Sequence, residues 1–201
     1  MFKISRNDLC LCGSRIKYKK CCFLNPDKNN GIERALKSSM TIDEAKKVFS
    51  MPILSYRVKV ELIDHPAYEL VHEVSKTFLI TGKETLYDLH MKIQRAFDWD
   101  NDHMFSFYIF NKIDDKVFEY SAAPDGEHYV SKWRDTEPAS ETEIRDLEFY
   151  EGLKFRYLFD YGDKFTHEVS VIKIEGEAEL NNIPFKLLES KGECPSQYGS
   201  Y

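Results

Sequence analysis

The chain has 201 residues, of which 42% are hydrophobic and 14% are aromatic, so it can form one ordinary domain with a small appendage. No apolar run reaches the length that spans a bilayer, and the N-terminus lacks the apolar stretch of a secretory signal. These features argue against a membrane span and predict a cytoplasmic protein whose thiols stay reduced.

The net charge of -6 is unevenly distributed along the chain. Residues 1–30 hold seven Lys and Arg against two acids, which makes this segment +5. The remaining residues hold 21 basic and 32 acidic side chains, which makes them -11. A basic head on an acidic body indicates that the two parts meet different partners, although two oppositely charged halves can also attract each other.

Four of the five cysteines fall within thirteen residues: Cys10, Cys12, Cys21 and Cys22. Zinc prefers four tetrahedral ligands, and thiolates are common ones in structural sites. Cys21 and Cys22 must lie on a turn or helical segment to reach one ion, since neighbours on a strand point to opposite faces. Two disulfides or four unrelated thiols are the alternatives, but disulfides are rare in the cytosol. The spacing predicts one structural Zn²⁺ ion.

The stretch RNDLCLCGSRIKYKKCC resembles the SEC-C motif, R-N-D/E-P-C-P-C-G-S-G-K-K-Y-K-K-C-C/H, of the translocation ATPase SecA and many bacterial proteins. All four ligand positions are kept, whereas Leu9 and Leu11 stand where the family usually has Pro. The resemblance implies a structural zinc and a contact role, as in the docking of SecA to a chaperone, the ribosome and acidic lipid. Partner protein, ribosome or RNA would meet the basic head through Lys17, Lys19 and Lys20.

A turn-rich break over Asn25–Gly31 separates this head from the rest of the chain. Thr41 and Glu44 have the spacing of a capping box and predict a short helix over 41–50, with another helix possible over 32–38. We therefore expect three parts: a zinc module over 1–26, a helical connector over 27–54 and a main domain over 55–201.

The main domain begins with alternating apolar residues that predict a strand over Tyr56–Leu62. A second strand is expected over 70–80. Residues 85–98 predict an amphipathic helix with Thr85 as its N-cap. The remaining expected elements are strands over 104–110, 116–120, 154–160 and 165–174, with a short helix or extended link over 139–147. This order predicts an α+β domain with a largely antiparallel sheet.

Two loop clusters of acids and histidines are candidate sites, because such side chains at strand ends commonly carry function. One is Trp99-Asp100-Asn101-Asp102-His103, and the other is the Asp160–Asp163 turn with the following His167. If the clusters meet, four side chains can bind a divalent metal: His103, Asp160, Asp163 and His167. Alternatively, the acids only form turns and the histidines only make local hydrogen bonds.

Three segments of the main domain carry a second resemblance: YRVKVEL, TLYDLHMKIQRAFDWDNDHMFSF and FRYLFDYGDKFTHEVSV. They resemble the plasmid pRiA4b ORF-3-like family from about residue 55 to the C-terminus, which implies an α+β fold. Phe165 stands where the family has Trp, and Cys194–Gln197 lacks the acids of the family's C-P-P-E-D segment. Any site that those acids help to form in relatives is weakened in this chain.

Two functions are compatible with these patterns. The first is a zinc-containing binding or adaptor protein without enzymatic activity, because no P-loop, Rossmann glycines, nucleophile elbow or HExxH helix is present. The second is a metal-dependent hydrolase or nucleic-acid-processing enzyme that uses the His and Asp cluster. A charge of -11 disfavours nucleic acid as a partner of the main domain.

Overall fold

The structure of the protein, a computed structural model, divides into two units, Met1–Pro52 and Ile53–Tyr201. The structure describes residues 4–8, 10–11, 16–24, 32, 53–111, 115–128, 136–147, 149–177 and 185–198. The connector helices expected over 32–38 and 41–50 lie outside this set, except for Ile32, which is helical and buried.

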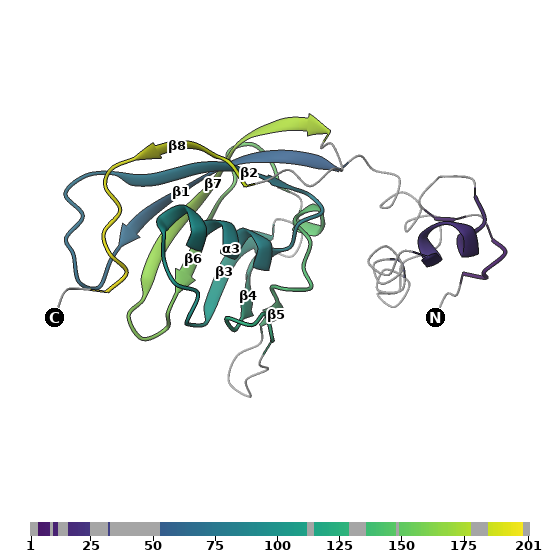
Figure 1. The fold of residues 1–201 in the computed structure, drawn as a ribbon, viewed down its shortest axis with the longest axis horizontal. Coiled ribbons are helices and arrows are strands. Elements are labelled where there is room, and N and C mark those ends of the chain that lie inside the picture. The colour runs from purple at the N-terminus through teal and green to yellow at the C-terminus, as the bar shows by residue number, and fades with distance from the viewer. Residues whose placement is uncertain are drawn as a thin grey trace. The chain divides into compact units, whose positions relative to one another are not determined.

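An eight-stranded sheet forms the second unit, in the order β5-β4-β3-β6-β7-β1-β2-β8 (Figure 1). All neighbouring strands pair antiparallel except β4 and β5, which are parallel. This arrangement agrees with the predicted α+β class and its largely antiparallel sheet. The strands are β1 (Leu54–Asp64), β2 (Val74–Thr81), β3 (Phe105–Asn111), β4 (Lys116–Ala122), β5 (Glu137–Pro138), β6 (Lys154–Phe159), β7 (Phe165–Glu177) and β8 (Leu187–Lys191).

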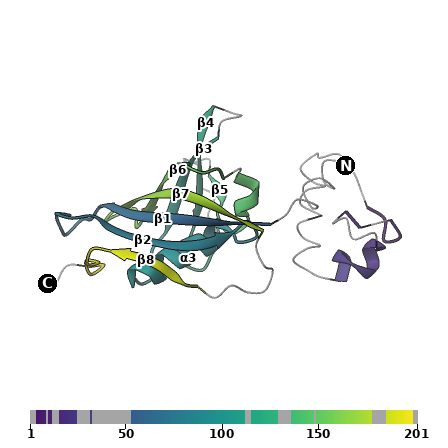
Figure 2. The ribbon, with the colours of Figure 1, turned by 90° about the horizontal axis from the view of Figure 1, so that it is seen from above.

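One helix, α3 (Leu86–Phe97), covers one face of the sheet (Figures 1 and 2). The predicted N-cap is confirmed, since the Thr85 hydroxyl accepts a hydrogen bond from the Asp88 backbone N–H at 3.1 Å. The Asp88 carboxylate in turn accepts from the Thr85 N–H at 2.7 Å, which completes a capping box. The helix ends at Asp98, whose φ of 58° is in the left-handed region.

The helix-facing side of the sheet is built from residues that alternate along each strand. Across β1 and β7, Val58 lies opposite Val171, and Val60 lies opposite Val169. All four are buried, and burying each such side chain stabilises the fold by roughly 1.5–3 kcal/mol. The next position in the same row of β7 is His167, which therefore belongs to the core face.

Some predicted boundaries differ from the structure. Strand β2 begins at Val74 rather than at residue 70, and Leu70–Glu73 joins no strand. The sequence did not predict β8, because its residues are exposed on both faces and show no alternation. Within the predicted 139–147 segment, a short 3₁₀ helix, η3 (Ile144–Leu147), forms. In the described part of the chain, no helix is long and apolar enough to cross a membrane.

Candidate functional site

Three cysteine thiols converge in the first unit. The Sγ atoms of Cys10, Cys21 and Cys22 all lie within 4.8 Å of one another. Cys21 Sγ and Cys22 Sγ are 3.9 Å apart, and no disulfide joins any two of the three cysteines. Zn–S bonds of about 2.3 Å in a tetrahedron hold thiolates about 3.8 Å apart, so the three sulfur atoms fit a zinc ion. Cys12, the fourth predicted ligand, lies outside the described residues.

Two short 3₁₀ helices, η1 (Tyr18–Lys20) and η2 (Cys22–Leu24), position the second cysteine pair. The Cys21 N–H donates to the Tyr18 carbonyl at 3.0 Å, and the Leu24 N–H donates to the Cys21 carbonyl at 3.1 Å. These tight turns orient both adjacent thiols toward the same point, whereas neighbouring residues on a strand would point to opposite faces. The Cys10 N–H donates to the Ile16 carbonyl at 2.8 Å. This hydrogen bond holds Cys10 close to the segment that carries Cys21 and Cys22.

Two of the three thiols are buried, since Cys10 is 4% exposed and Cys22 is 2% exposed. Tyr18 and Ile32 are buried in the same small cluster. A thiolate in such a place is costly unless a cation neutralises it. The cluster therefore has the donor set, the spacing and the burial of a structural metal site.

A basic surface made by Lys17, Lys19 and Lys20 adjoins the thiol cluster. All three residues are exposed, and two of them lie in η1 beside the buried Tyr18. Ile16 and Leu24 are also exposed, at 49% and 71%. The segment that holds the thiols thus presents both positive charge and apolar side chains to solvent.

In the second unit, His103 joins two of the candidate loops. Its Nε2 lies 3.6 Å from Asp160 Oδ2, and its Nδ1 lies 2.9 Å from Asp102 Oδ1. The Asp102 hydrogen bond raises the pKa of His103, and the nearby Asp160 charge adds to the effect. Asp160 also shapes its own turn, because its Oδ1 accepts from the N–H groups of Gly162 at 2.8 Å and Asp163 at 3.3 Å. Asp160 therefore forms a turn, as the alternative to a metal site expected.

His167 lies elsewhere, inside the core. Its ring contacts those of Phe97, Trp99 and Tyr157 at centroid distances of 5.0, 5.4 and 5.2 Å. Neither ring nitrogen makes a well-aligned hydrogen bond in the described structure. Burial lowers the pKa of His167 to about 3, and the Phe165 backbone opposes this effect only in part. In the described part of the chain, only the cysteine trio brings three metal-binding side chains within 4.8 Å. The predicted set His103, Asp160, Asp163 and His167 does not form such a group.

The sequence patterns did not single out a buried polar network around His90. His90 Nε2 donates to Asn101 Oδ1 at 2.8 Å, and its Nδ1 accepts from the Tyr157 hydroxyl at 2.7 Å. Gln94 Nε2 donates to the same hydroxyl at 2.8 Å. Burial lowers the pKa of His90 to about 3, so the ring is neutral. The signal was available, because His90 directly follows Leu89 on the buried side of the amphipathic helix.

Comparison with known families decides where this chain belongs. The family model described as Plasmid pRiA4b ORF-3-like protein matches residues 55–198, and the SEC-C motif model matches residues 6–24. The chain belongs to the plasmid pRiA4b ORF-3-like family. SEC-C is a zinc-binding motif, which agrees with the close approach of Cys10, Cys21 and Cys22.

A solved relative of this fold is a protein of unknown function from Methanosarcina mazei Go1, whose crystal structure superposes with a TM-score of 0.60. It shares 16% identity with this chain and covers 73% of it, and the match covers 75% of the archaeal chain. At this identity the likeness concerns the fold alone. No match was found among the curated proteins.

The C-terminal segment of this family member, Cys194–Tyr198, contacts the same loop as His103. Gln197 Nε2 donates to Asp102 Oδ1 at 3.0 Å, and the Tyr198 hydroxyl donates to Asp102 Oδ2 at 2.9 Å. Gln197 Oε1 accepts from the Asp100 N–H at 2.6 Å. The Gln197 amide and the Tyr198 hydroxyl thus bond to the two oxygens of Asp102, one of which also lies 2.9 Å from His103 Nδ1.

Proposed function

We propose that this protein is a zinc-containing adaptor whose SEC-C module docks on an acidic partner protein. The observation that carries the proposal is the convergence of three thiols within 4.8 Å beside an exposed basic surface. Zinc supplies the stability that a segment of this length cannot obtain from a hydrophobic core.

The positive charge of the zinc module indicates the chemistry of its partner. Residues 1–30 are +5 overall, and Lys17, Lys19 and Lys20 are all exposed. An acidic protein surface complements these side chains, while the exposed Ile16 and Leu24 add apolar contact area. Ribosomal RNA offers the same negative charge and is the competing outcome of the test.

No observation favours the enzymatic alternative, a hydrolase or nucleic-acid-processing activity in the second unit. It requires His103, Asp160, Asp163 and His167 to share one ion, and His167 lies in the aromatic core instead. The acidic charge of residues 31–201 also opposes the binding of phosphates.

Elemental analysis of the purified full chain tests the metal site. We expect about one zinc per chain, which Cys21→Ala removes because one of four ligands is lost. Cys194→Ala is the matched control, since it removes the cysteine of the second unit and leaves the trio intact. A metal that remains in the Cys21→Ala protein would instead favour a site in the second unit and the enzymatic alternative.

Binding of the full chain to immobilised poly-glutamate and to purified ribosomes tests the docking role. We expect binding to poly-glutamate that weakens as salt rises and is lost when the three lysines of the basic surface are changed to Glu. The matched control changes three exposed lysines of the second unit: Lys83, Lys116 and Lys186. Equal loss in both triple variants would contradict docking through the module, and binding to ribosomes alone would identify RNA as the partner.

A further inference from the structure

Ile32 is fully buried in the first unit although it lies outside the matched zinc motif. The SEC-C model matches residues 6–24, and the zinc module expected from the sequence ends at residue 26. The side chain of Ile32 is nevertheless 0% exposed and belongs to one hydrophobic cluster with Cys10 and Cys22. The apolar surroundings of the thiols in this chain therefore include a residue that the motif does not specify.

Leu11 is the second aliphatic member of this cluster and is 2% exposed. It directly follows Cys10, at a position where the family pattern usually has Pro. Tyr18, the remaining buried member, is a residue that the pattern itself contains. Leu11 and Ile32 are thus the two buried members of the cluster that the motif does not predict. We call them the aliphatic pair.

The aliphatic pair can act on the metal site only by excluding water. Neither side chain has a polar atom, so neither can bind the ion or donate a hydrogen bond to a thiolate. Zinc leaves a thiolate site when a proton or a competing chelator reaches the sulfur atoms, because only the thiolate form is a ligand. An apolar shell around a metal site limits that access.

We propose that Leu11 and Ile32 seal the zinc site of this chain from solvent and thereby slow the release of the ion. The thiolates hold the ion, and the seal adds no ligand. Zinc binding and the burial of Ile32 then stabilise each other, since a coupling between two events is reciprocal. The inference rests on the zinc site of the proposed function and is independent of the docking role.

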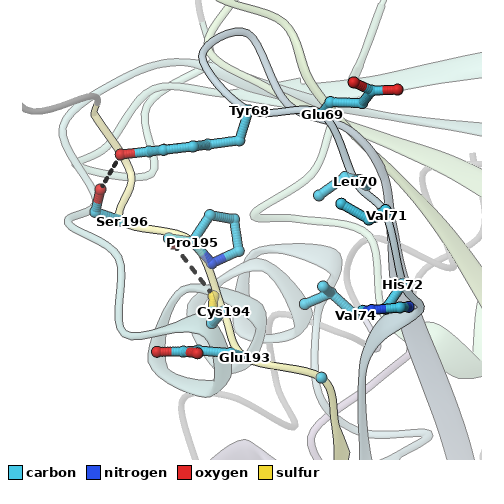
Figure 3. Close-up of a pocket in the computed structure, with 11 residues that line it drawn as sticks. Tyr68, Glu69, Leu70, Val71, His72, Val74, Glu193, Cys194, Pro195 and Ser196 are labelled. Atoms are coloured by element: carbon cyan, nitrogen blue, oxygen red, sulfur yellow. Dashed lines mark hydrogen bonds between the residues drawn. The ribbon is translucent and has the colours of Figure 1, made fainter.

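The cysteine of the second unit, Cys194, provides an internal reference for measurements on the thiols. It lies in the wall of a pocket of about 420 Å³ (Figure 3). Its thiol donates to the Phe97 carbonyl oxygen at 3.2 Å, and burial raises its pKa to about 11. Cys194 therefore reacts slowly with alkylating reagents for reasons that do not involve zinc.

Zinc release from the loaded full chain to excess pyridylazoresorcinol, followed by absorbance, tests the proposal. Ile32→Ala and Leu11→Ala should each release zinc about tenfold faster than the wild type, since the groups around metal ligands have effects of this order. Ile32→Val removes less of the side chain and should give an intermediate rate, which keeps the order of rates readable if Ile32→Ala holds no zinc. The matched control is Leu24→Ala, which truncates an aliphatic side chain of the same unit that is 71% exposed, and it should release zinc like the wild type.

Two further measurements separate sealing from the loss of a ligand. The visible spectrum of the cobalt(II)-substituted protein reports the thiolate coordination and should be the same in the wild type and in the Ile32 variants that bind metal. Alkylation by iodoacetamide, resolved by mass spectrometry, should be faster at Cys10 and Cys22 in these variants, whereas Cys194 should keep its wild-type rate.

The proposal is overturned if Ile32→Ala and Leu24→Ala release zinc at the same rate, or if Cys194 is also alkylated faster, because the change would then loosen the whole chain. A changed cobalt(II) spectrum would overturn it as well, since Ile32 would then position a ligand. A wild-type chain that binds no zinc would overturn the proposed function together with this inference. A zinc-loaded chain whose release rate does not depend on Ile32 would overturn the inference alone.

Discussion

His103 Nε2 lies 3.6 Å from Asp160 Oδ2, which links the loop after α3 to the turn between β6 and β7. The other ring nitrogen, Nδ1, lies 2.9 Å from Asp102 Oδ1. A carboxylate on each side of the imidazole favours its charged form. This arrangement brings two of the four predicted site residues together, and its electrostatic consequence is measurable.

The pKa of His103 should fall when Asp102 is changed to Asn, because the Asp102 hydrogen bond is the largest cause of the raised value. The charged histidine stabilises the fold below the unfolded pKa of about 6.5, and this contribution is lost as pH rises through the higher folded pKa. NMR titration of the His103 ring measures the shift. Asp125→Asn, at an exposed turn, is the control and should leave the His103 pKa unchanged. An unaltered pKa in Asp102→Asn would contradict the role of Asp102.

Gln197→Glu should lower the free energy of unfolding by about 1–2 kcal/mol at pH 7, since two carboxylates would then meet and a hydrogen bond is lost. The wild-type amide donates to Asp102 Oδ1 at 3.0 Å and to the Asp100 carbonyl at 3.2 Å. Urea unfolding at pH 7 and at pH 4 measures the loss, which should shrink as the carboxylates protonate. A Glu variant as stable as the wild type would contradict this reading of the contact.

His167→Leu should change stability at pH 7 by less than about 1 kcal/mol, because the replaced ring nitrogens make no well-aligned hydrogen bond. Below pH 6.5 the unfolded chain takes up a proton that the folded chain, with a His167 pKa of about 3, does not. Stability therefore falls by up to about 1.4 kcal/mol per pH unit for this residue as pH drops.

Urea unfolding between pH 7 and pH 4 measures this slope. It should be smaller in His167→Leu but not abolished, because burial also lowers the pKa of His90 to about 3 and lowers that of His65. His72→Leu, at an exposed position, should keep the wild-type slope. A loss above about 2 kcal/mol at pH 7 would show that His167 has a polar partner after all.

Tyr157→Phe should destabilise the second unit by about 1–3 kcal/mol, because His90 Nδ1 and Gln94 Nε2 both lose their partner in the core. Tyr68→Phe is the control, since its hydroxyl bonds to Ser196 Oγ at an exposed position and should cost less than about 1 kcal/mol. Thermal unfolding of the two variants makes the comparison. Equal melting temperatures would contradict the importance of the buried network.

Local sequence determined the features that depend on neighbouring residues. The spacing of Cys10, Cys12, Cys21 and Cys22 predicted thiols that gather, and the structure places the three described ones within 4.8 Å of one another. Thr85 and Asp88 are three residues apart, so the capping box forms within one helical turn whatever the rest of the chain does. The alternating residues of β1 predicted its buried face for the same reason.

Tertiary structure alone decided which distant side chains meet. Asp102 and Gln197 are 95 residues apart, and their hydrogen bond exists because the chain after β8 returns across the end of α3. The position of His167 has a related cause: it shares the face of Val169 and Val171, so the sheet register directs it into the core and away from His103 and Asp160. Short-range sequence patterns reflect the backbone preference of a segment and which of its side chains face the core. Contacts between remote segments depend instead on how the strands pair and pack across the whole sheet.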